Sequence, residues 1–86
     1  LLITNMINRI IISDDLIKYL EDRKLEEQYK KAKEYILGWF YKQVDFKIRE
    51  PKKDKVYYFR INKQFRAFCK LENNILKIFH IDNHQN

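Results

Sequence analysis

Residues 55–84 decide the fold, and they read KVYYFRINKQFRAFCKLENNILKIFHIDNH. Aromatic and β-branched residues are frequent here, and apolar residues alternate with polar ones over much of the stretch, as is typical of strands. The pair Asn73-Asn74 is a strong signal for a hairpin turn. The most apolar segment should lie inside the sheet. We predict three strands: Val56–Ile61, Gln64–Leu71 and the mostly apolar Ile75–Ile81.

The first half of the chain predicts one strand and two helices. A short β-branched run, Ile7–Ile12, forms the strand. Ser13 then offers an N-cap for a helix that ends at about Glu21. Apolar residues recur at helical spacing from Lys24 or Leu25 to about Leu37, which predicts a second helix that ends at Gly38.

After the second helix, the period of the sequence changes to two. Val44–Arg49 alternates apolar and charged residues, which predicts a half-buried strand, and residues 51–54 form a basic turn. Trp39, Phe40 and Tyr41 are interpreted as core or interface residues, with a base-stacking platform as the alternative. The order β-α-α-β-β-β-β predicts an α+β fold, in which two N-terminal helices pack on one face of a curved antiparallel sheet.

A chain of 86 residues makes one small domain, which we take as residues 1–86. Met6 is a candidate start, which would make residues 1–5 an upstream extension. The single cysteine excludes an internal disulfide and fits a reducing cytoplasm. No apolar run approaches the roughly 20 residues of a membrane span, and the N-terminal run is too short for a signal peptide. We expect a cytoplasmic protein without a membrane partner.

The net charge of +6 is distributed unevenly along the chain. Residues 42–70 hold ten basic and three acidic side chains, a net charge of +7, whereas residues 14–34 hold seven acidic and six basic ones. The basic excess therefore lies on the predicted sheet, and it favours a polyanion such as nucleic acid as the partner. The alternatives are a surface kept basic for solubility, or one matched to an acidic protein.

Two arginines fall on neighbouring strands of one predicted hairpin. Arg60 and Arg66 can converge as cross-strand neighbours, and two guanidiniums are costly to bury without partners. They should therefore meet acids such as Asp82 or Glu72, or else face a phosphate. A guanidinium suits phosphate because its planar fork donates two hydrogen bonds.

The last strand carries the candidate proton-transfer groups. Unbroken alternation places Leu76, Ile78, His80 and Asp82 on one face, and His84 shares their parity if the strand continues. A histidine beside a carboxylate suits general acid–base chemistry. The alternative for His84 is a solvated histidine without a role, and His80 is interpreted as a core or edge histidine.

The remaining titratable residues give no sign of a metal or cofactor site. Cys69 alternates with apolar residues and is predicted to lie in the core. A metal site needs more ligands at fixed spacing than His80, Asp82 and His84 offer. The sequence has no phosphate-binding glycine loop, dinucleotide fingerprint or nucleophile elbow.

Two segments of the C-terminal third resemble the RelE/ParE toxin superfamily. RINKQFRAF at residues 60–68 is close to the family pattern R-I-N-x-Q-[WF]-R-x-x-F, and IDNH at residues 81–84 is similar to its C-terminal D-Y-H. Within the superfamily, the chain is most similar to the HigB-type toxins. The size and the order of the elements also agree, so the resemblance covers most of the chain.

The resemblance implies the toxin of a type II toxin–antitoxin system, an mRNA endonuclease that acts on the ribosome. Such toxins enter the ribosomal A site and cleave the bound codon without a metal or cofactor. The ribose 2′-hydroxyl attacks the neighbouring phosphorus and leaves a 2′,3′-cyclic phosphate. Arg66 matches the arginine that steadies charge on the phosphate, His84 matches the proton-transfer histidine, and Asp82 matches the adjacent aspartate.

The resemblance also implies RNA contacts and partners. Lys52, Lys53 and Lys55 lie where family members often carry phosphate-binding lysines. Arg60 and Lys63 would contact the backbone of rRNA or mRNA. The implied partners are the ribosome, mRNA and a cognate antitoxin, which would neutralise the toxin by covering the basic sheet.

The chain departs from the family pattern near its end. Asn83 stands where the pattern has tyrosine, and Gln85 and Asn86 close the sequence where RelE-like members place a further arginine and tyrosine. Asparagine cannot stack on a base as tyrosine can, so catalysis would be weaker or differently arranged. Two alternatives therefore remain open: a ParE-type inhibitor of DNA gyrase, which needs no catalytic histidine, and an inactive member that only binds its antitoxin.

Overall fold

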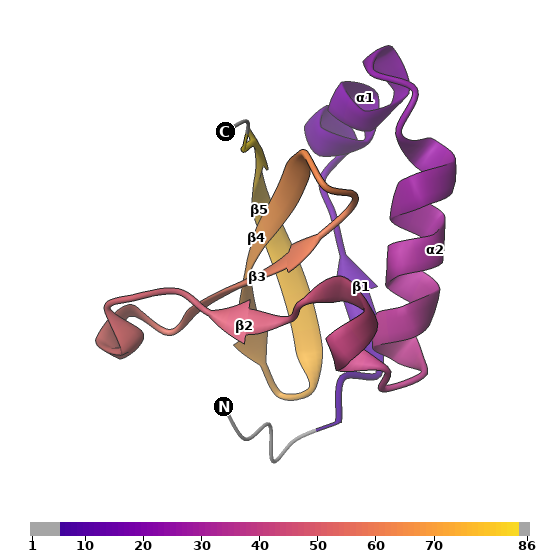
Figure 1. Cartoon of the computed structure of the whole chain (residues 1–86). Coiled ribbons are helices and arrows are strands. Elements are labelled where there is room, and N and C mark those ends of the chain that lie inside the picture. The colour runs from indigo at the N-terminus through magenta and orange to yellow at the C-terminus, as the bar shows by residue number, and fades with distance from the viewer. Residues whose placement is uncertain (1–5, 85–86) are drawn as a thin grey trace.

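Two helices cover one face of a five-stranded sheet (Figure 1). The computed structural model describes residues 6–84, so the extension expected at residues 1–5 lies outside the described residues. Neither helix is long and apolar enough to cross a membrane. The helices are α1 (Asp14–Asp22) and α2 (Glu26–Leu37), with 3₁₀ helices at Tyr41–Val44 and Lys52–Asp54. The strands are β1 (Arg9–Ile11), β2 (Lys47–Ile48), β3 (Val56–Arg60), β4 (Phe65–Glu72) and β5 (Ile75–Asn83).

The sheet has the strand order β1-β5-β4-β3-β2 and is mixed. β1 and β5 are parallel, with Arg9 opposite Ile75, whereas the other neighbouring strands are antiparallel. The predicted α+β class and order of elements are confirmed, but the expectation of a wholly antiparallel sheet is wrong. Side chains alternate in the same way in parallel and antiparallel strands, so the sequence pattern carries no information about the direction of β1.

Local sequence signals set the ends of the helices, as predicted. The Oγ of Ser13 accepts a hydrogen bond of 3.3 Å from the backbone N–H of Leu16 at the start of α1. Gly38 ends α2 with a φ of −90°, so its conformation does not require glycine. A Cβ there would lie 3.1 Å from the Phe40 ring and 3.3 Å from the Glu34 carbonyl oxygen. Close approach is therefore what favours glycine at this position.

The core lies between the helices and the sheet face that they cover. Cys69 is fully buried in it, as predicted, and its thiol donates to the Tyr57 carbonyl oxygen at 3.5 Å. Burial raises the pKa of this thiol well above its usual range, which keeps it neutral and unreactive. The other buried residues of this core include Leu20, Leu25, Ala32, Ile36, Phe59, Ala67, Leu76, Ile78 and Ile81.

A β-bulge in β5 changes which residues share a face of the sheet. Phe68 pairs with His80 and Cys69 pairs with Ile78, so Phe79 has no partner on β4. Ile78 therefore points into the core, whereas His80 lies on the opposite face with Phe68. The prediction that the even-numbered residues of β5 share one face is wrong, because one inserted residue reverses the alternation.

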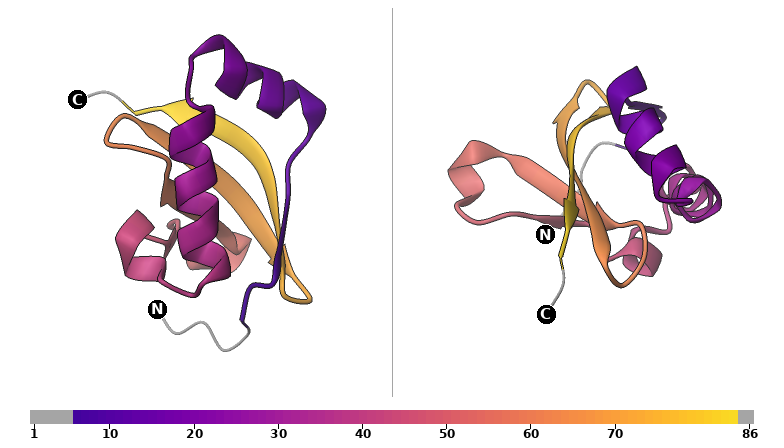
Figure 2. Two further views of the ribbon diagram at one scale, coloured as in Figure 1. Left: turned by 90° about the vertical axis from the view of Figure 1, so that its right-hand side faces the viewer. Right: turned by 90° about the horizontal axis from the view of Figure 1, so that it is seen from above.

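The connection between α2 and β3 contains a short strand and a projecting turn. β2 covers only two residues of the predicted strand Val44–Arg49, because a 3₁₀ helix ends at Val44 and Asp45 has a left-handed φ of 51°. The basic turn after β2 is confirmed and contains the second 3₁₀ helix. It projects on the side of the sheet that faces away from the helices (Figure 2). We name residues 51–55 the basic arm.

The aromatic residues after α2 do not all reach the core. Tyr41 packs against the core, but Trp39 and Phe40 are 53% and 61% exposed, so the core interpretation is wrong for these two. Trp39 takes a left-handed φ of 68°, and its indole N–H donates to the Ile7 carbonyl oxygen at 3.2 Å. The hydrogen bond holds the indole at the surface.

Candidate functional site

The sheet face that points away from the helices carries Arg66 and Asp82, two of the predicted catalytic residues, and we name it the open face. Side chains that are opposite each other in an antiparallel ladder lie on the same face, which identifies its members. Five of them are cations and two are acids, so the face is basic, in agreement with the charge distribution of the sequence. They are Lys47, Val56, Tyr58, Arg60, Arg66, Phe68, Lys70, Glu72, Ile75, Lys77, His80 and Asp82.

Phe68 lies at the centre of the open face, and it is only 7% exposed although it does not face the core. The rings of Tyr58 and His80 lie 5.7 and 5.9 Å from its ring, centre to centre. The guanidinium carbons of Arg66 and Arg49 lie 5.1 and 5.7 Å from the same ring centre. Cations are attracted to an aromatic face at such distances, so the aromatic cluster holds two guanidiniums on the sheet.

Arg66 meets Asp82 directly across the β4–β5 ladder. The Nη2 of Arg66 donates to the Oδ2 of Asp82 at 3.1 Å, and the guanidinium also lies 5.3 Å from the Tyr58 ring. The Arg66 side chain is 19% exposed. Its Nε is buried and finds no acceptor within residues 6–84. A guanidinium has five N–H donors, so this one is held in place with donors to spare for an oxyanion.

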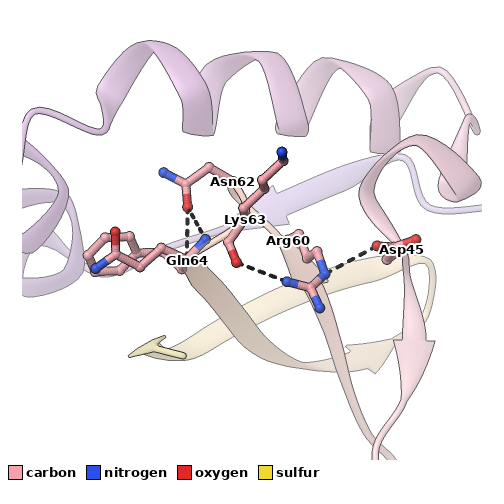
Figure 3. Close-up of polar contacts among 6 residues, drawn as sticks. Asp45, Arg60, Asn62, Lys63 and Gln64 are labelled. Atoms are coloured by element: carbon pink, nitrogen blue, oxygen red, sulfur yellow. Dashed lines mark hydrogen bonds and ion pairs between the residues drawn. The ribbon is translucent and has the colours of Figure 1, made fainter. Parts of the chain in front are cut away.

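Arg60 is the ladder partner of Arg66, but its guanidinium is turned to different groups. Its Nε lies 3.2 Å from the Oδ2 of Asp45, and its Nη1 donates to the Lys63 carbonyl oxygen at 3.1 Å (Figure 3). The predicted meeting of Arg66 with an acid is confirmed for Asp82. The convergence of the two guanidiniums on one ligand is not, because Asp45 holds Arg60 at the edge of the sheet.

The β3–β4 turn places Arg60 and Lys63 together. The Oδ1 of Asn62 accepts hydrogen bonds of 2.8 Å from the backbone N–H groups of Gln64 and Phe65, which fixes the turn (Figure 3). The amide of Asn62 also donates to the Oε1 of Gln28 on α2 at 2.8 Å. The exposed Lys63 thus lies on a turn that is tied to both the sheet and α2.

His80 lies on the open face beside the Arg66–Asp82 pair, two residues before Asp82 on β5. The histidine is exposed, so a position in the core is wrong. β1 pairs only with residues 75–77, which leaves His80 with a β-partner on one side, as expected for an edge histidine. Alternation predicted that His80 and Asp82 share a face, because they lie two residues apart on the strand. The bulge separates this pair from Leu76 and Ile78, which lie in the core.

β5 continues two residues past the predicted end at Ile81, and His84 follows its last residue, Asn83. The condition under which His84 would share the strand parity of Asp82 is therefore not met. The backbone N–H of His84 donates to the Gln64 carbonyl oxygen at 2.6 Å, which holds the chain against the start of β4. The neighbouring Asn83, at the tyrosine position of the family pattern, accepts a hydrogen bond of 3.0 Å from the Gln64 side chain. Both residues therefore close the end of the sheet, and the half-buried His84 lies two residues beyond Asp82.

The predicted RNA-binding lysines lie on the basic arm. Lys52 and Lys53 belong to its 3₁₀ helix, and Lys55 follows with a left-handed φ of 53°. All three are exposed. The Nζ of Lys70 on β4 donates to the Asp54 carbonyl oxygen at 2.8 Å, so the arm is tied to the open face. The lysines of the arm thus stand beside the face that holds Arg66.

Among residues 6–84, no group of three or more His, Cys, Asp or Glu side chains is placed to hold a metal ion. No protein-family model matches the chain, and no curated protein matches it. What the site can do chemically therefore follows from its own geometry and from the motif residues.

Proposed function

We propose that this chain is a toxin of the RelE/ParE type, a ribosome-dependent endoribonuclease that cleaves mRNA in the A site and so inhibits translation. One observation carries the proposal: Arg66 and Asp82 form a pair on a basic open face, with guanidinium donors to spare and His80 on the same face. The RINKQF motif and the order of the elements add support.

The arrangement suits an attack of RNA on its own backbone. The ribose 2′-oxygen bonds to the neighbouring phosphorus, and the bond from phosphorus to the 5′-oxygen breaks. A 2′,3′-cyclic phosphate and a free 5′-hydroxyl result. Negative charge grows on the phosphate oxygens in the transition state, where a fixed cation stabilises it most. Arg66 suits this role because Asp82 and the rings of Tyr58 and Phe68 hold its guanidinium in place.

Two protons move in this reaction, and two histidines are at hand. A base takes the proton of the 2′-hydroxyl, and an acid gives a proton to the leaving 5′-oxygen. His80 and His84 flank Asp82 along the chain, each two residues away from it. We assign one transfer to each histidine, and Asp82 positions Arg66.

The cations outside the pair would guide the RNA strand. Lys52, Lys53 and Lys55 would contact backbone phosphates from the basic arm, and Arg60 and Lys63 would contact mRNA or rRNA at the β3–β4 turn. Each phosphate contact releases counterions, so binding should weaken as salt increases. A cognate antitoxin would neutralise the protein by covering the open face with acidic groups.

One observation favours a second candidate, a ParE-type inhibitor of DNA gyrase. Asn83 replaces the tyrosine of the D-Y-H pattern, and its side chain is engaged with Gln64 at the end of the sheet. A gyrase inhibitor would use the basic surface without proton transfer. It would leave mRNA intact and raise DNA-damage signalling, whereas a protein that only binds its antitoxin would do neither.

The test is mRNA cleavage on programmed ribosomes, with the 5′ ends of the fragments mapped. We expect cuts within the A-site codon that disappear when ribosomes are omitted. Arg66→Ala should lower the cleavage rate by about 10²–10³-fold. Arg23→Ala is the matched control, because Arg23 also lies over a tyrosine ring, that of Tyr19 on α1. Intact mRNA at saturating wild-type protein would refute the proposal.

A further inference from the structure

A groove lies between the basic arm and the β4–β5 hairpin, away from the Arg66–Asp82 pair. It has a volume of about 650 Å³, within the usual range of ligand sites. Lys70, in the groove, is four residues from Arg66 on β4, which places the two sites about 13 Å apart along the strand. The groove is lined by Asp54, Lys55, Lys70, Leu71, Glu72, Lys77 and Phe79.

Phe79 is the residue that the bulge in β5 inserts, and its side chain is 50% exposed. It is absent from the core and lines the groove together with lysines. A large apolar ring at an exposed strand position contributes little to the fold. The bulge thus presents an aromatic surface beside cations, and bulges commonly re-aim side chains at functional sites.

The ammonium groups of the groove are positioned and remain accessible. Lys70 donates to the Asp54 carbonyl oxygen at 2.8 Å, and an ammonium has two further donors. Lys77 pairs with Glu72 at 2.7 Å, but their side chains are 49% and 62% exposed. Such an exposed ion pair is weak, so an incoming phosphate can compete for the lysine. Lys52 and Lys53 extend the positive charge along the arm.

This combination matches the chemistry of a single-stranded nucleic acid. Bases of any sequence stack on an exposed aromatic ring, and lysines beside it bind the backbone phosphates. An apolar peptide would have to desolvate the ammonium groups, and an acidic peptide would leave the Phe79 ring unused. The charge and the ring together therefore favour one occupant.

We propose that the groove is a second nucleotide-binding site, in which an unpaired RNA base stacks on Phe79 while Lys55, Lys70 and Lys77 hold adjacent phosphates. The proposal rests on the proposed function only in taking RNA as the strand that crosses the open face. The groove then holds the strand about 13 Å from the bond that Arg66 serves.

Fluorescence anisotropy tests this with the full chain and a labelled single-stranded RNA of about ten nucleotides. Phe79→Ala should weaken binding by about 5- to 150-fold, and Phe79→Trp should retain it. Phe40→Ala is the matched control, because Phe40 is another exposed phenylalanine and lies outside the groove. Lys77→Gln should reduce the slope of log Kd against log salt by about 0.7, the value for one phosphate contact. A duplex of the same sequence should bind without sensitivity to Phe79.

Wild-type affinity in Phe79→Ala, or equal losses in Phe79→Ala and Phe40→Ala, would overturn the proposal. So would a wild-type protein that binds no single-stranded RNA at low salt. Failure of the proposed function reads differently: Phe79-dependent binding would persist while ribosome-bound mRNA stays intact. Conversely, if cleavage depends on Arg66 but Phe79 has no effect on RNA binding, the nucleotide-binding role of the groove is refuted and the proposed nuclease function is supported.

Discussion

Arg66 shows how one residue can be both half-buried and available. Its guanidinium lies close to the Tyr58 and Phe68 rings and also pairs with the Asp82 carboxylate. A lysine could keep the charge, but it would lose the planar fork that shares donors between a carboxylate and a phosphate. The geometry therefore explains why arginine rather than lysine suits this position.

The two histidines give the first prediction at this scale. His80→Gln and His84→Gln should each lower the single-turnover rate of mRNA cleavage by about 10²–10⁴-fold, because each removes one proton transfer. Ribosome binding and the circular dichroism spectrum should stay unchanged, since neither side chain belongs to the core. A glutamine variant that cleaves at the wild-type rate would exclude its histidine from the mechanism.

Tyr29 gives a prediction about stability. Its hydroxyl is buried without a partner among the described residues, and burial, aided by nearby Cys69, raises its pKa from 10.0 to about 12. The unfolded chain therefore loses this proton first, so stability falls as pH increases from 10 towards 12. Tyr29→Phe should raise the free energy of unfolding at pH 7 by about 1 kcal/mol and reduce the alkaline fall. Denaturant titrations at pH 7 and pH 11 measure both effects, and an unchanged alkaline fall would exclude Tyr29 as its source.

At the scale of elements, periodicity predicted the helices and most strands because each depends on local signals. Ser13 caps α1 through its own hydroxyl, and Asn73-Asn74 turns the β4–β5 hairpin with φ values of 49° and 67°. The bulge at Phe79 could not be predicted, because an inserted residue is visible only against the partner strand. In the candidate site, Arg66 and Asp82 were predictable from the motif, and alternation predicted that His80 shares the face of Asp82. That Leu76 and Ile78 lie on the opposite face was not predictable, because the bulge causes it.

Deletion of Phe79 tests this view of the bulge. The deletion makes Ile78 and His80 consecutive, and their partners Cys69 and Phe68 are consecutive on β4. The ladder should therefore close, with the melting temperature changed by only a few degrees and the Arg66–Asp82 pair preserved.

Deletion of Lys77 is the matched control for the bulge. It would close the ladder with Ile78 on the open face opposite Lys70 and with the larger Phe79 in the core opposite Cys69, so it should destabilise the protein far more than the deletion of Phe79. Thermal melts of the two deletion variants measure this difference in stability. Equal loss of structure in both would mean that the bulge itself is required for folding.

At the scale of the whole molecule, the fold separates stability from binding. The helices and the core occupy one side of the sheet, and the basic arm projects on the other side (Figures 1 and 2). The Arg66–Asp82 pair and the Phe79 groove then lie along one face, where a single strand can contact both. An antitoxin that covered this face would block both sites at once.

Expression in growing cells tests the assembled proposal. Wild-type protein should arrest growth with rapid loss of mRNA, because cleavage in the A site stops translation. Arg66→Ala and His84→Ala should each restore growth at equal protein levels, whereas Arg23→Ala should remain toxic, since Arg23 lies at the C-terminal end of α1 over the Tyr19 ring. Colony counts, immunoblots and mRNA half-lives give the readout. If Arg66→Ala still arrests growth, with intact mRNA and induced DNA-damage signalling, the protein is instead an inhibitor of DNA gyrase. Such an inhibitor acts by binding alone, so it does not need a fixed cation at a phosphate.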